Sequence, residues 1–426
     1  MLKFRKQLSL LYISVYSLVL GYLMSFRPEA APTVSYLGML FSAIINPMLL
    51  VCTYICIRMF DIVHGSFQVL SMEAIIIIYC FNTIYKYRGY VVKYINATLL
   101  FGVFAFLSAL FGYQTSITSL IPFIFLFFIF LTIGTMKLSS QEDMIIVTLC
   151  VCGVVVGLFG YYQFISGDIL SESGRLGFDG SIRRVSNAVA FPLFYAVYKL
   201  LNKPKGFNIV LWSLLILLLG TVLILTYSRG VILAVIITAV FLFLFSRGEV
   251  GFTKVVLTLV SGGLVFFIIN SVNIDSELMF RELDTASGRT DIWDYYNSKI
   301  AEGGFMRILF GFGPGDTMRV AANSAYQDFY AHSLFLDFFY CFGILGAVCM
   351  LYILIILSRT IIKEKSIFYI AVLVLSITMY LTHGIASQIH FYCMLGLCLG
   401  EAVYTGKKVT KARMSSKLLN HQSLYA

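Results

Sequence analysis

Charged residues are scarce in this sequence: aspartate, glutamate, lysine and arginine together make up 12% of its 426 residues. A typical soluble domain has about 25%. Hydrophobic residues reach 59% of the chain, and a soluble protein of this length needs far more polar surface to cover its core. The shortage of charge therefore excludes an ordinary soluble protein.

The sequence also lacks the patterns that indicate zinc sites, disulfide frameworks or repeat architectures. It has nine cysteines, but none has the spacing and polar setting of a zinc site, and no disulfide framework is visible. No internal repeat is evident at a solenoid period. The sequence therefore gives no metal site. The cysteines all lie in or beside apolar runs: Cys52, Cys56, Cys80, Cys150, Cys152, Cys341, Cys349, Cys393 and Cys398.

The net charge is +10, a value that is also common among nucleic-acid-binding proteins. Here, however, the basic residues form no patch. They occur in short clusters between apolar runs, as expected for the cytoplasmic loops of a membrane protein. This pattern favours the lipid bilayer as the partner and predicts no nucleic-acid binding.

Long apolar runs are what the sequence has in abundance. About thirteen stretches reach or approach the length of roughly 20 residues that crosses a bilayer as a helix. We therefore predict an all-α, polytopic transmembrane helical bundle. The first run, 8–24, follows three basic residues without a clear cleavage site and predicts a retained signal-anchor helix. The stretches centre near residues 16, 46, 76, 103, 126, 154, 193, 217, 238, 262, 345, 374 and 395.

Both termini are predicted to be cytoplasmic, which requires an even number of crossings. We expect about 12 spans, with one early stretch within 1–115 lying in the interface or re-entering. The predicted organisation is a bundle over 1–270, with a short outer loop at about 166–186, and an extracytoplasmic loop over 271–331. C-terminal transmembrane helices then follow over 332–406, and a cytoplasmic tail over 407–426.

The long outer loop, 271–331, has nine acidic and five basic residues, the reverse of the balance in the whole chain. Within it, Gly288–Ile300 predicts a short amphipathic helix with Ile292, Tyr296 and Ile300 on one face. The run 311–315, Gly-Phe-Gly-Pro-Gly, predicts a turn. The loop should therefore contain short helices of its own.

Several arginines at the predicted outer surface are candidates for binding a phosphate, because a guanidinium group bonds to phosphate oxygens bidentately. Arg229 lies in a short hinge between two apolar helices, where a snorkelling interfacial arginine is the alternative. Arg289 opens the amphipathic helix and has acidic neighbours as alternative partners. Arg175, Arg183 and Arg184 lie in the first outer loop, which solvation would also explain.

His332 directly follows the long loop and begins a predicted spanning helix. A neutral imidazole at a boundary between water and membrane can act as a general base. A lone histidine usually has a structural role, and the preceding loop is what favours a catalytic one here. His383 and His390 flank the last predicted outer turn, and we expect them to pack or hydrogen-bond locally.

Four segments of the C-terminal half together resemble the superfamily of O-antigen ligases and of O-antigen and capsular polysaccharide polymerases. These enzymes are membrane glycosyltransferases that use polyprenyl-diphosphate-linked sugars. The similarity lies in order, spacing and membrane setting, although Ser333 follows the histidine where the family often has asparagine. The matching residues are Ser228–Val231, Gly288–Arg289 with Trp293, Leu309–Gly315, and Ala331–Ser333 with Leu336 and Gly343–Gly346.

The resemblance implies a helical bundle with a long external loop and no nucleotide-sugar, metal or other cofactor. It assigns the donor diphosphate to Arg229 and Arg289, and activation of the acceptor hydroxyl to His332. Aromatic residues such as Trp293 and Tyr296 would offer stacking surfaces for sugar rings, with packing of the loop as the alternative. The active site would face the periplasm or cell exterior, in a bacterial inner (plasma) membrane.

We expect a polymerase that transfers glycan from a polyprenyl-diphosphate carrier to a sugar hydroxyl of another lipid-linked repeat unit. Polymerases of this type commonly have a protein partner that regulates chain length. The first alternative is an O-antigen ligase, which transfers the glycan to lipid A core. A flippase for lipid-linked oligosaccharides is the alternative of another class, and internal symmetry or charge at mid-membrane depth would favour it.

Overall fold

The computed structural model describes residues 2–60, 62, 66–111, 120–139, 141–167, 176–178, 181–202, 206–245, 289–314, 333–383 and 388–405. Nearly all of these residues are helical, and no strand occurs among them. Six helices are long and apolar enough to cross a membrane. This confirms the prediction of an all-α, multi-pass membrane bundle, while the total of about 12 spans stays a prediction.

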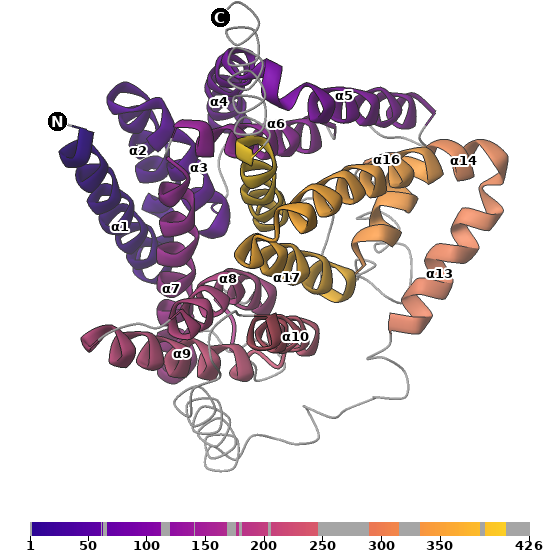
Figure 1. The fold of residues 1–426 in the computed structure, drawn as a ribbon. Helices are drawn as coiled ribbons and strands as arrows, with labels where there is room; N and C mark the ends of the chain where they lie inside the picture. Colours follow the sequence, from indigo (N-terminus) through magenta and orange to yellow (C-terminus); the bar gives the residue numbers. More distant parts are fainter. Residues whose placement is uncertain are drawn as a thin grey trace, which may run out of the picture.

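Among the described residues, nine α-helices precede Arg229. Helix α7 packs against α1, α3, α8 and α9, which places it near the centre of this group (Figure 1). The bounds are α1 Leu2–Phe26, α2 Ala31–Ile45, α3 Pro47–Phe60, α4 Ser66–Lys86, α5 Arg88–Phe111, α6 Ile121–Met136, α7 Glu142–Ser166, α8 Ile182–Leu201 and α9 Phe207–Leu225.

In the C-terminal half, two helices of the predicted outer loop pack against the bundle. Helix α10 packs against α8 and α17, and α16 packs against α5, α14 and α17. In Figure 1, α14 adjoins one end of α16 and α13 extends beyond it. The bounds are α10 Arg229–Phe245, α13 Arg289–Glu302, α14 Gly304–Phe310, α16 Leu334–Glu364 and α17 Ile367–His383, followed by a last helix, Ile389–Thr405.

The predicted stretch centred near residue 46 is not one continuous helix. Asn46 has extended backbone angles (φ −158°, ψ 114°) and separates α2 from α3. Its side-chain oxygen accepts a hydrogen bond from the backbone N–H of Met48 at 3.0 Å, as an N-cap residue does. Pro47 has no N–H and favours the first turn of a helix. The Asn-Pro pair therefore ends one helix and starts the next, which hydrophobicity alone did not reveal.

Helix α16, which contains the predicted stretch centred near residue 345, is also interrupted. Gly343 has φ 65° and ψ −170°, a conformation that is essentially confined to glycine. The part after Gly343 is still about 30 Å long, enough to cross the hydrocarbon core. The nine residues before it form a separate short helix, so the polar start of α16 need not share the orientation of the span.

The break in α16 is filled by the turn that follows α14. In an unbroken helix, the carbonyls of Tyr340 and Cys341 would accept from residues 344 and 345. Here they accept from the backbone N–H of Phe312 at 2.8 Å and of Gly313 at 3.0 Å. Ser108 on α5 also donates to the Cys341 carbonyl, at 2.5 Å. The amides of the predicted glycine-rich turn therefore form hydrogen bonds with the carbonyls that the interruption of α16 leaves free.

The end of α5 fixes this junction from the other side. The guanidinium of Arg307 donates to the carbonyl of Phe111, the last residue of α5. A cation at the C-terminus of a helix is also favoured by the helix dipole. The rings of Phe111 and Phe310 lie 5.1 Å apart. Helix α14 is thus attached both to α5 and to α16.

A cluster of charged side chains joins the ends of four helices. Lys137, in the 3-10 turn Lys137–Ser139 after α6, contacts Glu401 of the last helix and lies 3.4 Å from Glu142 of α7. It also donates to the hydroxyl of Tyr369 on α17, which in turn donates to Glu142 at 2.6 Å. The three charged side chains are only 12–18% exposed, so each charge depends on its partners.

Replacing Lys137 by Met should destabilise the bundle, because two mostly buried carboxylates would lose their cation. Removal of one partner from a buried ion pair typically costs about 3 kcal/mol or more. Thermal unfolding of the purified protein in detergent measures the effect. The control is Lys363→Met, which removes an exposed charge at the end of α16. Equal melting temperatures for the two variants would contradict the role given to the cluster.

Gly311→Ala should separate α14 from the break in α16. A Cβ at Gly311 would come within 2.5 Å of the Cys341 carbonyl, and its φ of 78° is unfavourable for alanine. Gly304→Ala is the matched control, because its φ is 72° but a Cβ there would meet nothing within 4 Å. The expected result is faster protease cleavage between α13 and α16 in Gly311→Ala than in Gly304→Ala. Equal cleavage would show that backbone strain alone accounts for the effect.

Candidate functional site

The turn between α9 and α10 holds Arg229 in a defined place. Tyr227 has φ 50°, rare for a residue with a side chain, and the turn is closed by a bond from Arg229 N–H to the Tyr227 carbonyl at 3.0 Å. The hydroxyl of Thr226 accepts from the N–H of Ser228 at 3.3 Å. Arg229 is therefore the first residue of α10 and is half-buried.

A second arginine turn begins α8. The side chain of Ser181 caps this helix by accepting from the N–H of Arg184 at 3.4 Å. The guanidinium of Arg184 donates to the carbonyl of Phe178 at 3.5 Å and lies 5.8 Å from the centre of its ring. Arg183 and Arg184 are both half-buried in the first turn of α8.

The two turns lie at the same end of neighbouring helices. The N–H of Leu176 donates to the carbonyl of Leu225, the last residue of α9, at 3.0 Å. This bond connects the segment before α8 to the segment before α10, and α8 packs against both α9 and α10 (Figure 1). Arg183, Arg184 and Arg229 thus lie at the same end of the bundle.

Arg183, Arg184 and Arg229 all lie in the first turn of a helix. The N-terminus of a helix carries a partial positive charge, which opposes an arginine in its first turn. The same helix end, with its free N–H groups, stabilises a phosphate or carboxylate. Arg183 and Arg229 lie in the first turns of helices of 20 and 17 residues. Two helix N-termini and three guanidinium groups therefore make this end of the bundle suited to a polyanion.

Buried polar residues lie next to the arginine turns, and two of them, Asn187 and Gln388, were not predicted from the sequence. Asn187 on α8 is 3% exposed and donates from Nδ2 to Gln388 Oε1 at 2.5 Å. Gln388 precedes the last helix, and His390 lies buried in its first turn. The expectation that His390 packs locally agrees with this burial. A polar residue within an apolar run, as Asn187 is, was the available signal.

Two polar atoms in this region have no hydrogen-bond partner within the described part of the chain: Asn187 Oδ1 and His390 Nε2. Leaving such an atom buried and unpaired costs about 1–3 kcal/mol. Asn187 forms the contact with Gln388, and His390 follows Gln388 by two residues. Asn187 lies one turn after Arg183 and Arg184 on α8. The region therefore offers uncharged hydrogen-bonding groups next to its cations.

The amphipathic helix of the outer loop is confirmed as α13. Ile292, Tyr296 and Ile300 are all buried, and they pack with Tyr340 of α16. The rings of Tyr296 and Tyr340 lie 4.8 Å apart, and Phe312 stacks on Tyr340 at 4.6 Å. Tyr296 is 1% exposed, so its ring takes part in packing. This is the alternative to sugar stacking that the sequence left open. Trp293 is half-buried on the same helix.

The exposed side of α13 has an ion pair of its own. Lys299 donates to Glu302 at 2.8 Å, and this hydrogen bond to a carboxylate raises the pKa of the lysine. Both side chains are more than a third exposed. The pair lies in solvent, where such interactions contribute little to stability, and it takes no part in the site.

Three predicted site residues are not placed by the structure. Arg175 and His332 lie outside the described residues, and Arg289 is described only by its backbone, as the first residue of α13. Ser333, directly after His332, has extended backbone angles and precedes α16. Asp337, which the sequence showed only as an interruption of an apolar run, is buried in the first turn of α16. Roles for these residues stay predictions.

No group of three or more histidine, cysteine, aspartate or glutamate side chains within the described residues is arranged to hold a metal ion. The described cysteines are free, although Cys56 and Cys152 lie with their sulfurs 3.1 Å apart.

Residues 214–351 match a protein-family model that is described as O-antigen ligase. The match covers about a third of the chain. It begins within α9, ends within α16, and includes Arg229, α13, the turn after α14 and the break at Gly343. No curated protein matches the chain. The resemblance inferred from the sequence motifs is thus confirmed over this segment, which is similar to the O-antigen ligase family.

Proposed function

We propose that this protein is a polysaccharide polymerase of the bacterial inner membrane. It transfers glycan from a polyprenyl-diphosphate carrier to a sugar hydroxyl of another lipid-linked repeat unit, in the synthesis of O-antigen or capsule. The observation that supports the proposal is that Arg183 and Arg184, in the first turn of α8, and Arg229, at the start of α10, lie at the same end of two packed helices. The family match over 214–351 supports the reaction class.

In this proposal the arginines bind the diphosphate of the donor. Arg229 and the N-terminus of α10 contact it from one side, and Arg183 and Arg184 at the start of α8 contact it from the other. The polyprenyl chain lies along the apolar surface of the bundle. Because this end of the bundle is only half-exposed, the guanidinium groups are partly shielded from water, which strengthens their effect on charge that develops during the reaction.

The reaction is a single displacement at the anomeric carbon. The acceptor hydroxyl oxygen forms a bond to that carbon as the bond to the diphosphate oxygen breaks, and the configuration is inverted. His332 takes the hydroxyl proton, and Arg229 and Arg289 stabilise the negative charge on the departing diphosphate. The diphosphate is already a good leaving group, so the proposed mechanism needs neither a strong acid nor a metal ion.

Sugar recognition is assigned to Trp293 and to the buried polar residues near α8. Trp293 is half-buried on α13 and is suited to stacking on a sugar ring. Asn187 and His390 have unpaired buried atoms that a sugar hydroxyl would satisfy. Helices α13 and α14 pack on α16, so Trp293 and the start of α16 belong to the same packed group of helices.

The ligase alternative is favoured by the description of the matching family model. It uses the same donor and the same arginines, and differs in its acceptor, lipid A core.

The flippase alternative would be favoured by charge within the membrane. In the described part of the chain, the least exposed carboxylate side chains are Glu73 on α4 and Asp337 on α16, and Asp337 lies at a helix end.

Purified protein in liposomes, supplied with lipid-diphosphate-linked repeat units, should produce a ladder of longer glycans. Arg229→Ala should lower kcat/KM about 10²–10³-fold, the usual cost of removing one group that stabilises transition-state charge. Arg229→Lys should recover only part of this, because lysine lacks the bidentate geometry. His332→Ala and Arg289→Ala should abolish the ladder. The control is Arg27→Ala, an arginine that is 72% exposed beside Glu29.

Normal activity of Arg229→Ala would contradict the proposed donor site. The other outcomes separate the alternatives. Wild-type protein that is silent until lipid A core is added is a ligase. Wild-type protein that forms no glycosidic bond in either assay, but moves the lipid-linked units between leaflets, is a flippase.

A further inference from the structure

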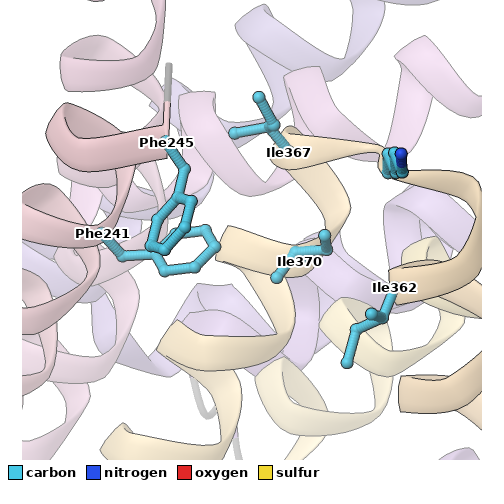
Figure 2. A pocket seen from close by; sticks show the side chains of 6 residues that line it. Phe241, Phe245, Ile362, Ile367 and Ile370 are labelled. Atoms are coloured by element: carbon cyan, nitrogen blue, oxygen red, sulfur yellow. The ribbon is translucent and has the colours of Figure 1, made fainter. Parts of the chain in front are cut away.

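An apolar cavity of about 400 Å³ lies between the end of α10 and the connection from α16 to α17. It opens to the surface of the bundle. Figure 2 shows the rings of Phe241 and Phe245 on one side and the isoleucines of α16 and α17 on the other. The lining residues are Phe241, Phe245, Ile362, Lys365, Ile367 and Ile370.

The walls of this cavity suit a hydrocarbon chain. Five of its six lining residues have apolar side chains. The two phenylalanine rings pack against each other, with centres 4.7 Å apart, and form a continuous surface one turn long at the end of α10. A sugar or a soluble anion would lose its hydrogen bonds to water here without finding new ones.

Lys365 supplies the one cation in the lining. It follows α16 in the left-handed conformation (φ 54°), and its backbone N–H bonds to the carbonyl of Ile362. Its side chain is exposed and forms no ion pair with the described residues. With Arg359, Lys363 and Glu364, the connection has a net charge of +2. The sequence predicts that this basic connection is cytoplasmic.

We propose that this cavity binds an anionic phospholipid. One acyl chain lies against Phe241, Phe245 and Ile370, and the phosphate pairs with Lys365. A basic rim above an apolar space between helices is the combination that selects such headgroups. The cavity is separate from the donor site: Arg229 begins α10 and Phe245 ends it, which places them about 25 Å apart along the helix.

Native mass spectrometry of the delipidated, full-length protein tests this proposal. The probes are phosphatidylglycerol and phosphatidylethanolamine with identical acyl chains, and glycerol phosphate without chains. Wild-type protein should prefer phosphatidylglycerol, and Lys365→Gln should weaken its binding about fivefold, as expected for one lysine near a lipid surface. Lys363→Gln is the matched control, because Lys363 is exposed on the same connection but does not line the cavity.

Ile370→Trp tests the acyl-chain part by filling the cavity. It should weaken binding of both phospholipids, in a protein whose melting temperature without lipid stays within a few degrees of wild type. If Ile370→Trp does not fold, Lys365→Gln alone decides, because its side chain is exposed. Equal losses in Lys363→Gln and Lys365→Gln would overturn the site in favour of diffuse surface charge. Equal binding of glycerol phosphate, or displacement by polyprenyl phosphate at equal concentration, would also overturn the proposal.

Discussion

The need to pair every main-chain N–H and carbonyl in a membrane governs the arrangement of this protein. Within hydrocarbon, an unpaired group costs several kcal/mol, so an interrupted helix needs partners from elsewhere in the chain. The break at Gly343 finds them in the amides of Phe312 and Gly313 and in the hydroxyl of Ser108. The two amide bonds hold the end of α14 against α16, and the Ser108 bond joins the break to α5.

The distribution of charge also follows from the cost of placing polar groups in hydrocarbon. Spanning segments are nearly free of charge, so cations that stay near the membrane occupy helix ends. At one end of the bundle these cations are arginines that begin helices α8 and α10, against the direction of the helix dipole. At the ends of α6 and α16 they are lysines, one enclosed by carboxylates and one beside an apolar cavity. The two faces are thus chemically different.

The sequence predicted those features that depend on neighbours along the chain. The buried face of α13 was read from the spacing of Ile292, Tyr296 and Ile300, and the turn at 311–315 from its glycines. Contacts between distant residues left no such pattern. Asn187 pairs with Gln388, 201 positions away, and nothing in either local sequence identifies the other. The break at Asn46 was hidden because apolar residues continue on both sides, so hydrophobicity alone could not locate it.

The ion pair between Lys137 and Glu401 joins residues that are 264 positions apart. During synthesis, Lys137 can meet Glu142 almost at once, but the second carboxylate is made 264 residues after the lysine. The four helix ends at this surface can therefore reach this arrangement only after residue 401 has been made. Until then the packing of the N-terminal helices at this surface is incomplete, and the helix Ile389–Thr405 completes it.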